Sequence, residues 1–498
     1  MIRAVLTIGA LQFLTMVLML ARTKILAVTL GPSAVGTMSV IDKLTAMVAQ
    51  TISLSLPFAA LRFLPSALRE SPESMDLLYR RMRGVILTLV IPATVICITI
   101  SIGAPARWGV ALLPHQRVVT LAFAGLPVIA LAPFLTSAFA GGMGHARSMR
   151  FSIAHAGVML LAAVAAGIGL GLSGYYGVYA VLGVALMVVG ARRVMLGARA
   201  GRRALSPVDV FRLPAVVWRF SGALIALTFA APYAALFVQY TTLRLYGAAA
   251  SGILQSAIGV SLSVRALLGT AHAVFLTPHV NRQADTADRM AWANGFQRTT
   301  VLLFVIVLPP LLLFADVALR LLYSGRFVGA SSFVALFVAA EVVTLLSGTY
   351  QALIIAGDRM LFHVVQNLAA QALLAGIAAI ALPRIGLAGA GLATLAAPLF
   401  LFGTTLTFLR RRFAVRVSRE AAMMALLTAT LLLACGTIGS RYPGLSPGRL
   451  GAKLAFCGGV WLASYLVMPA EDRARLRYGA ARVKQEVMAR TAQHGGRG

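Results

Sequence analysis

Long apolar runs recur along the whole chain at a spacing typical of membrane-spanning helices. At about 1.5 Å rise per residue, a run of about 18 to 26 residues crosses the ~30 Å hydrocarbon core of a bilayer. Polar and charged residues gather in the connections between the runs. The pattern predicts fourteen transmembrane helices, at residues 5–28, 37–61, 84–103, 118–141, 152–171, 174–191, 220–243, 252–277, 299–321, 331–355, 361–382, 386–408, 421–439 and 452–469.

The composition agrees with an all-α polytopic membrane protein. Of the 498 residues, 59% are apolar and only 12% are charged, whereas a soluble protein of this size needs far more polar surface. The first run follows Arg3 as in a signal peptide, but it is too long and lacks a small-x-small cleavage site, so we expect it to be the first span. The three cysteines lie in apolar runs without paired spacing, and we therefore expect neither a disulfide framework nor a metal or other cofactor.

The basic residues fall mainly on one side of the predicted topology. The net charge is +30. With the N-terminus in the cytoplasm, 31 of the 44 Lys and Arg residues are cytoplasmic, 11 are on the other side when Arg22 and Lys24 are counted there, and Lys43 and Arg265 lie within spans. This asymmetry is the positive-inside rule, and it predicts that both termini are cytoplasmic. The orientation of the protein in the membrane and its contact with anionic lipid headgroups explain most of the positive charge. Little of that charge therefore remains as evidence for nucleic-acid binding.

A long basic connection divides the chain. Residues 192–219 are rich in Arg and are broken by Pro207 and Pro214, near the middle of the first twelve spans. We therefore expect two six-helix lobes around a central cavity, followed by two further helices. The predicted parts are an N-lobe at 1–197, a cytoplasmic linker at 198–219, a C-lobe at 220–413, the last two spans within 414–470 and a basic cytoplasmic tail at 471–498.

Two short motifs support an internal repeat. LGPSAVG at 30–36 and YGAAASG at 246–252 share a Gly-x4-Gly turn, 216 residues apart, and each lies between two long apolar runs. GHAR at 144–147 and GDR at 357–359 follow the fourth and tenth spans. Parallel repeats of this kind place a transported substrate between the two halves.

Charged residues flank the first of these turns inside apolar segments. Arg22 and Lys24 precede it, and Asp42 and Lys43 follow it. Lys24 and Asp42 each lie about 10 Å along the helix from the turn, so antiparallel neighbours present the charges at one depth. An ionised side chain at the centre of a span costs at least ~2.5 kcal/mol and usually faces a bundle interior or an aqueous cavity. The alternative, that Arg22 and Lys24 extend to the nearer interface, does not account for Asp42 and Lys43.

Later spans carry further candidate residues. Arg265 lies thirteen residues past Gly252, about 20 Å along the helix, too deep for easy extension to an interface. Arg244, Glu341 and Asn367 also fall within or beside predicted spans. The alternative for neutral residues such as Asn367 is that they only join helices by hydrogen bonds worth about 0.6 kcal/mol each.

The distribution of acidic residues argues against an enzyme. Only Asp42, Asp316 and Glu341 fall within spans, and the predicted non-cytoplasmic connections contain no Asp or Glu. A glycosidase or retaining transferase generally needs a carboxylate pair, and a metal-dependent site needs oxygen ligands. The excess of cations within the membrane instead favours an anionic cargo, and Arg and Lys both suit phosphate.

Two segments resemble a known family. RTKILAVTLGPSAVGTMSV looks like the first helix and turn of polysaccharide-biosynthesis flippases, whose pattern is roughly Arg-x-Lys, a few apolar residues, Leu-Gly-Pro and Val-Gly. LLYSGRFVGA at 321–330 is similar to their Leu-Leu-Tyr-Gly-x-x-Phe-x-x-Ala signature, although Ser324 displaces the glycine by one position. The resemblance implies the MATE-like fold of the multidrug/oligosaccharidyl-lipid/polysaccharide superfamily.

The implied activity is translocation of an undecaprenyl-diphosphate-linked oligosaccharide from the cytoplasmic to the outer leaflet of a bacterial inner membrane. The product would serve O-antigen (lipopolysaccharide), capsule or exopolysaccharide synthesis. Implied partners are the lipid-linked glycan, membrane lipids and a polysaccharide polymerase and glycosyltransferases. Arg22 and Lys24 match the family motif. Alternatives are a lipid II flippase or a multidrug exporter, whereas the missing outer carboxylates count against a membrane polymerase or glycosyltransferase.

Overall fold

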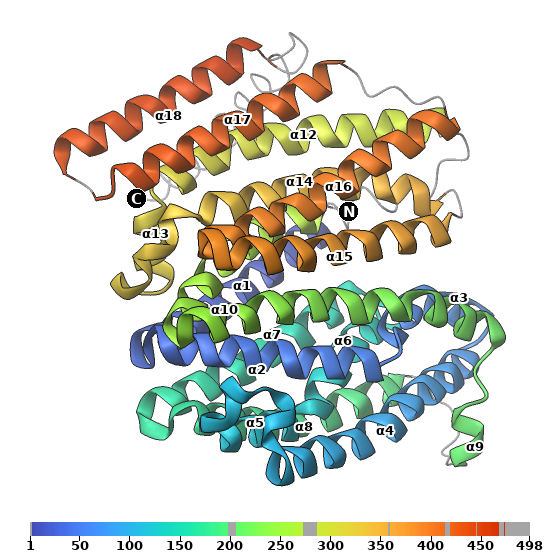
Figure 1. Ribbon diagram of the computed structural model, residues 1–498. Coiled ribbons are helices and arrows are strands. Elements are labelled where there is room, and N and C mark those ends of the chain that lie inside the picture. Colours follow the sequence, from blue (N-terminus) through green and yellow to red (C-terminus); the bar gives the residue numbers. More distant parts are fainter. Residues whose placement is uncertain are drawn as a thin grey trace, which may run out of the picture.

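The computed structural model describes residues 2–197, 206–271, 286–356, 359–413, 419–444, 446–467 and 473, and all regular structure among them is helical (Figure 1). The predicted all-α class is therefore confirmed. The helices are α1 (Ile2–Thr29), α2 (Gly31–Ile52), α3 (Leu56–Glu70), α4 (Pro72–Gly103), α5 (Gln116–Ala124), α6 (Leu126–Gly142), α7 (His145–Ala165), α8 (Gly171–Gly197), α9 (Pro207–Val210), α10 (Ala215–Ala271), α12 (Thr286–Leu313), α13 (Ala315–Leu322), α14 (Val334–Ala356), α15 (Met360–Ile385), α16 (Leu387–Phe413), α17 (Arg419–Arg441) and α18 (Pro447–Val467).

The described helices have the lengths and composition of a multi-pass membrane protein. Nine helical segments among them are long and apolar enough to cross a membrane, or ten if α2 and α3, bent by 46° at their junction, form one span. Two of the nine, His145–Val194 and Ala215–Arg265, have 50 and 51 residues, about twice the length that one span needs. Each contains two of the runs predicted from the sequence, although residues 272–277 lie outside the described part. The last two predicted runs form α17 and α18, which are not among the nine.

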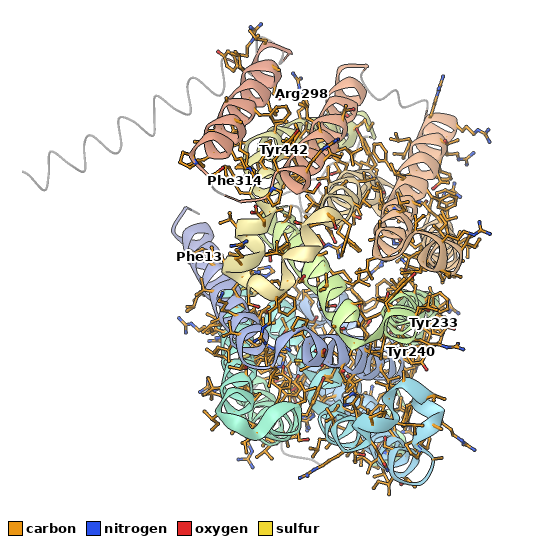
Figure 2. The ribbon with its side chains drawn as sticks, turned by 60° about the vertical axis from the view of Figure 1, so that its left-hand side comes forward. Phe13, Tyr233, Tyr240, Arg298, Phe314 and Tyr442 are labelled. Carbon is orange, nitrogen blue, oxygen red and sulfur yellow. The ribbon has the colours of Figure 1, made fainter. Side chains whose placement is uncertain are left out.

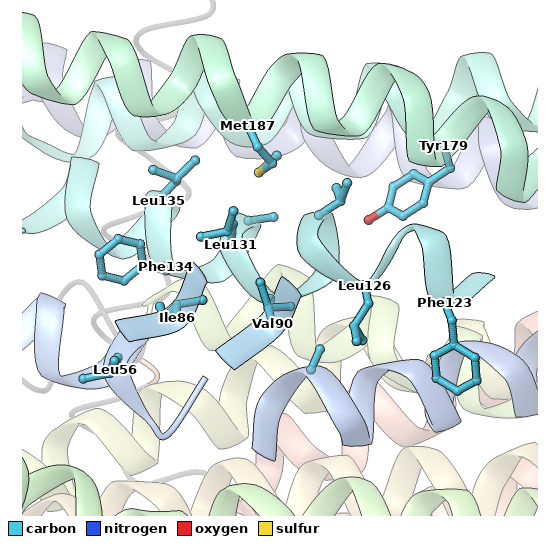
Figure 3. Close-up of a cluster of buried hydrophobic side chains, with 14 of the residues drawn as sticks. Leu56, Ile86, Val90, Phe123, Leu126, Leu131, Phe134, Leu135, Tyr179 and Met187 are labelled. Carbon is cyan, nitrogen blue, oxygen red and sulfur yellow. The ribbon is translucent and has the colours of Figure 1, made fainter. Parts of the chain in front are cut away.

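The buried apolar residues form two main clusters. The first joins α2–α8 and is shown in Figure 3, where Phe134 and Leu135 of α6 pack near Ile86 of α4 and Met187 of α8. The second joins the later part of α10 to α12–α18. In Figure 1 the blue and teal helices lie in the lower half, the yellow to red helices lie in the upper half, and α10 lies between them.

Large apolar side chains cover much of the outer surface. Phe13 of α1 and Tyr233 of α10, both labelled in Figure 2, are exposed, as are Ile96 of α4, Val181 of α8 and Leu361 of α15. Exposed apolar surface on this scale is costly in water but favourable against lipid chains. The surface therefore agrees with the multi-pass membrane class.

The two Gly-x4-Gly motifs form matching turns. The first glycine of each, Gly31 and Gly247, has a φ of 76° and 81°, a left-handed conformation that favours glycine. The second glycines, Gly36 in α2 and Gly252 in α10, pack against each other. A Cβ at Gly36 would lie 1.9 Å from the carbonyl oxygen of Ala248, and one at Gly252 would lie 2.0 Å from that of Pro32. The Gly-x4-Gly repeat is thus confirmed as a pair of turns, and only glycine permits this contact. Gly357 and Asp358 of the shorter repeat lie outside the described residues.

We expect Gly252→Ala to separate the two turns, because the added methyl group would collide with backbone rather than with a movable side chain. The measurement is disulfide formation in membranes between Ser33→Cys and Ala249→Cys, which flank the contact. The yield should fall when Gly252→Ala is added. Gly222→Ala in the same helix is the control, since a Cβ there has no neighbour within 4 Å among the described residues. Equal yields in both backgrounds would contradict this prediction.

Candidate functional site

Arg22 of α1 and Asp42 of α2, which flank the first turn, form an ion pair. Arg22 Nη2 lies 3.6 Å from Asp42 Oδ2, and Arg22 Nε donates a hydrogen bond of 2.9 Å to the Tyr175 hydroxyl. The Tyr176 hydroxyl donates to Asp42 Oδ1 at 2.7 Å. Only 13% of the Arg22 side chain is exposed. Arg22 is therefore held inside the protein by α2 and α8 and does not extend to the surface.

A cavity of about 540 Å³ opens beside this cluster. Asp42 is the one carboxylate among its described lining residues, and His155 contributes an imidazole whose Nε2 lies 3.1 Å from the Tyr179 hydroxyl. Tyr175, Tyr176 and Tyr179 form one wall. The cavity thus combines several aromatic rings with one carboxylate, which is paired with Arg22.

Polar side chains also connect the two halves of the chain. Lys43 Nζ of α2 donates to Gln255 Oε1 of α10 at 2.7 Å, and Lys24 Nζ of α1 donates to the Arg320 carbonyl oxygen of α13 at 2.8 Å. Neither lysine forms an ion pair with a carboxylate in the described part of the chain. Beside the glycine contact, the buried Gln239 amide of α10 donates to Ser39 Oγ of α2 at 2.7 Å.

Arg265 and Glu341 form a second ion pair. Arg265 Nε of α10 lies 2.6 Å from Glu341 Oε2 of α14, with 48% of the arginine side chain and 10% of the glutamate side chain exposed. The carboxylate therefore orients the guanidinium and leaves its terminal nitrogens available. The sequence predicted Arg265 and Glu341 as separate candidates and did not pair them.

Two predicted site residues stand apart from these contacts. Arg244 is exposed on α10. Asn367 Nδ2 of α15 donates to the carbonyl oxygen of His363 in its own helix at 2.7 Å. The Asn367 bond agrees with the alternative of a structural role, and the structure brings neither residue to the Arg22 or Arg265 pair by any recorded contact among described residues.

The two family-like segments also meet. Gly31 of the first turn lies beside Arg326 in the 321–330 segment, because a Cβ at Gly31 would be 3.2 Å from Arg326 Nη1. Tyr323 of the same segment packs on Gly259 of α10. The two motifs therefore form one end of the interface between the halves.

Sequence reasoning missed the polar partners in the later helices. Tyr175, Tyr176 and Tyr179 lie in the sequence YYGVY, an unusual cluster of hydroxyls within an apolar run, and that clustering was the available signal. Gln239 and Gln255 were single polar residues without a distinguishing pattern.

Comparison with known proteins gives structural matches only. No family model and no curated protein matches the sequence. The lipid II flippase MurJ in an inward closed conformation has a TM-score of 0.70 at 11% identity, covering 92% of this chain and 97% of that one. An inward-facing multidrug resistance MATE family transporter of the MOP superfamily has a TM-score of 0.61 at 15% identity, covering 82% and 96%. A MOP superfamily transporter from Pyrococcus furiosus with a binding pocket of reverse polarity has a TM-score of 0.56 at 13% identity, covering 82% and 95%.

These likenesses extend over most of both chains and concern transporters and flippases. Identities of 11% to 15% show a shared fold and do not carry over a substrate. The chain is a multi-pass membrane protein with the MATE-like fold of the MOP superfamily transporters.

Proposed function

We propose that the protein is a flippase that moves an undecaprenyl-diphosphate-linked oligosaccharide from the cytoplasmic to the outer leaflet of a bacterial inner membrane. The glycan would enter lipopolysaccharide, capsule or exopolysaccharide synthesis. The fold of transporters and flippases supports transport as the activity rather than catalysis, and the charge of the site supports the cargo.

The observation that carries the proposal is that four cationic side chains at the site have only two carboxylate partners among the described residues. Lys24 and Lys43 donate to neutral oxygens, whereas Arg22 and Arg265 each have one carboxylate partner. Within a medium of low dielectric constant, an uncompensated cation is expensive unless a mobile anion can approach it. A diphosphate carries such charge and accepts hydrogen bonds from both lysine and arginine.

In this proposal the diphosphate binds Arg22, Lys24, Lys43 and Arg265 between an N-lobe of residues 1–197 and a C-lobe of residues 220–413. The prenyl chain stays in lipid while the glycan crosses in the aqueous space between the lobes. The contact between Gly36 and Gly252 closes the outer end, and its separation opens that end. Asp42 and Glu341 orient Arg22 and Arg265 in this path. Arg244 and Asn367, which contact neither pair in the described part of the chain, are proposed to line the path elsewhere.

The positive-inside rule supports cytoplasmic placement of both termini. A membrane potential that is negative inside then favours outward movement of an anion by about 2.3 kcal/mol per charge per 100 mV. Cations of the protein that move with the anion reduce this gain, because they lower the net charge that moves. Membrane lipids, a polymerase and glycosyltransferases are proposed partners of the pathway.

Deletion of the protein is expected to make prenyl-diphosphate oligosaccharide accumulate on the cytoplasmic leaflet and to remove the corresponding surface glycan. Mass spectrometry of the lipid-linked pool, combined with leaflet-specific labelling of the glycan, measures this directly. An outward-facing pool equal to that of the parent strain, with no surface glycan missing, would contradict the proposal.

A second candidate comes from the cavity beside Asp42. Its three tyrosines and single carboxylate suit an organic cation, which aromatic faces and a negative charge both attract. This favours a MATE-type multidrug exporter, and the structural likeness to MurJ keeps a lipid II flippase as the closer alternative. Export of cationic dyes from whole cells, unchanged on deletion, would exclude the exporter.

A further inference from the structure

Two pockets at the ends of helices share a composition that the proposed transport path does not use. The first, of about 400 Å³, is lined by the ends of α6, α7 and α8, including Phe139, Phe151, Arg147, Arg150 and Arg193. The second, of about 600 Å³, is lined by the start of α15 and the end of α16, including Phe362, Phe400, Phe408, Arg411 and Arg412. Among the described lining residues, neither pocket contains Asp or Glu.

The arginines at both pockets are exposed and have no ion-pair partner within the described ranges. Aromatic side chains lie beneath them. The ring centroids of Phe139 and Phe151 are 5.4 Å apart, and the rings of Phe362 and Phe408 stack at 4.1 Å. Each pocket therefore presents positive charge at its mouth and apolar surface within it.

The pockets occupy matching places in the two halves. Gly190 lines the first and Gly403 lines the second, 213 residues apart, which is also the spacing between Gly144 and Gly357 of the shorter sequence echo. At Gly190 a Cβ would lie 2.8 Å from the Phe151 ring, so glycine is required for that ring to line the pocket. Two pockets of one composition at one repeat position indicate a common ligand.

The surface around both pockets is apolar and indicates that the ligand reaches them from the lipid bilayer. Val188 and Val189 beside the first pocket, and Leu361 and Leu399 beside the second, are exposed apolar side chains. Such residues face lipid chains in a membrane protein. Basic pockets between transmembrane helices on the cytoplasmic side bind anionic lipid headgroups, and the positive-inside pattern places all five arginines on that side.

We propose that each pocket binds one anionic phospholipid of the cytoplasmic leaflet, with the phosphate on the arginines and an acyl chain against the phenylalanines. A soluble anion would use only the arginines, whereas the rings and the lipid-facing rim favour a ligand with both parts. This inference needs the membrane orientation but does not need the proposed cargo. A flippase, a drug exporter or another transporter could carry the same two sites.

Native mass spectrometry of the purified full-length protein tests the proposal with phosphatidylglycerol and chain-matched phosphatidylcholine as probes. We expect the wild type to retain two phosphatidylglycerol molecules in preference to phosphatidylcholine. Arg411→Gln with Arg412→Gln should weaken one of the two sites about 30-fold, as expected for loss of two arginines near an anionic headgroup. Arg147→Gln, Arg150→Gln and Arg193→Gln together should weaken the other site.

Arg107→Gln with Arg117→Gln is the matched control, because these exposed arginines lie in the predicted non-cytoplasmic connection. It should leave both bound lipids in place, and excess inorganic phosphate should not displace them. Equal retention of phosphatidylcholine, displacement by phosphate, or the same phosphatidylglycerol binding in pocket and control variants would overturn the proposal. If the pocket variants lost binding of farnesyl diphosphate but kept binding of phosphatidylglycerol, the pockets would belong to a prenyl cargo. That result would also overturn the proposal.

Discussion

Arg265→Ala is expected to lower transport of the lipid-linked glycan by about 10- to 100-fold, the effect of losing one hydrogen bond to a charged group at 1.5–3 kcal/mol. The substitution removes the guanidinium that Glu341 orients and leaves a nearly buried carboxylate without its partner. Repulsion between that carboxylate and an arriving diphosphate adds to the loss. The measurement is surface glycan per cell at equal amounts of inserted protein.

Variants of the same pair separate binding from folding. Arg265→Lys should retain part of the activity, since the charge remains but the planar fork is lost. Glu341→Gln keeps an oxygen acceptor for Arg265 Nε and should retain substantial activity. Adding Glu341→Gln to Arg265→Ala removes the unpaired carboxylate and should restore thermal stability without restoring transport. Recovery of transport in that double variant would show that Arg265 acts only on the fold.

Asp316→Ala is expected to destabilise the protein by about 3–5 kcal/mol, the usual effect of removing one partner of a buried ion pair. Asp316 of α13 and Lys453 of α18 are 1% and 2% exposed, with Lys453 Nζ 3.5 Å from Asp316 Oδ1. Asp316 Oδ2 also accepts a hydrogen bond of 2.7 Å from the Gly444 backbone N–H. The pair thus joins α18 to the rest of the molecule, and Lys453 Nζ also lies 5.2 Å from the ring centroid of Phe314, which is labelled in Figure 2.

Thermal unfolding of purified protein in detergent measures this effect. Asp316→Leu combined with Lys453→Met should be nearly neutral or stabilising relative to either single change, because it removes both buried charges together. Asp209→Asn is a control, since the Asp209 carboxylate of α9 pairs with Arg212, whose side chain is 68% exposed. Unfolding of Asp316→Ala at the temperature of the control would contradict a structural role for the pair.

Features set by the backbone were predictable from the sequence. The apolar runs located the helices, because a membrane span must satisfy its own backbone hydrogen bonds and therefore forms a helix. The glycine spacing located the two turns, because Gly31 and Gly247 need positive φ. The similar distances of Lys24 and Asp42 from the first turn predicted that antiparallel neighbours would present the charges flanking it at one depth. In the structure Asp42 pairs with Arg22, and Lys24 donates to the Arg320 carbonyl oxygen.

Contacts between distant helices were not predictable. In a membrane protein, residues that face lipid and residues that face other helices are both apolar. The hydrophobic pattern of a span therefore does not reveal which face of the helix packs against its neighbours. Arg265 and Glu341 therefore remained separate candidates until α10 and α14 were placed. Lys453 falls at the start of the predicted span 452–469 and Asp316 within the span 299–321, and their contact likewise depends on how α18 and α13 are turned toward each other.

Transport by the purified protein in proteoliposomes tests the central claim most directly. The substrate is an undecaprenyl-diphosphate-linked oligosaccharide placed in one leaflet, and its arrival in the other is measured by labelling the glycan from one side only. The account predicts transfer by the wild type and by Arg107→Gln, and little transfer by Arg265→Ala or by Lys24→Ala with Lys43→Ala. Transfer no faster than in protein-free vesicles, while the same vesicles move an organic cation, would contradict it.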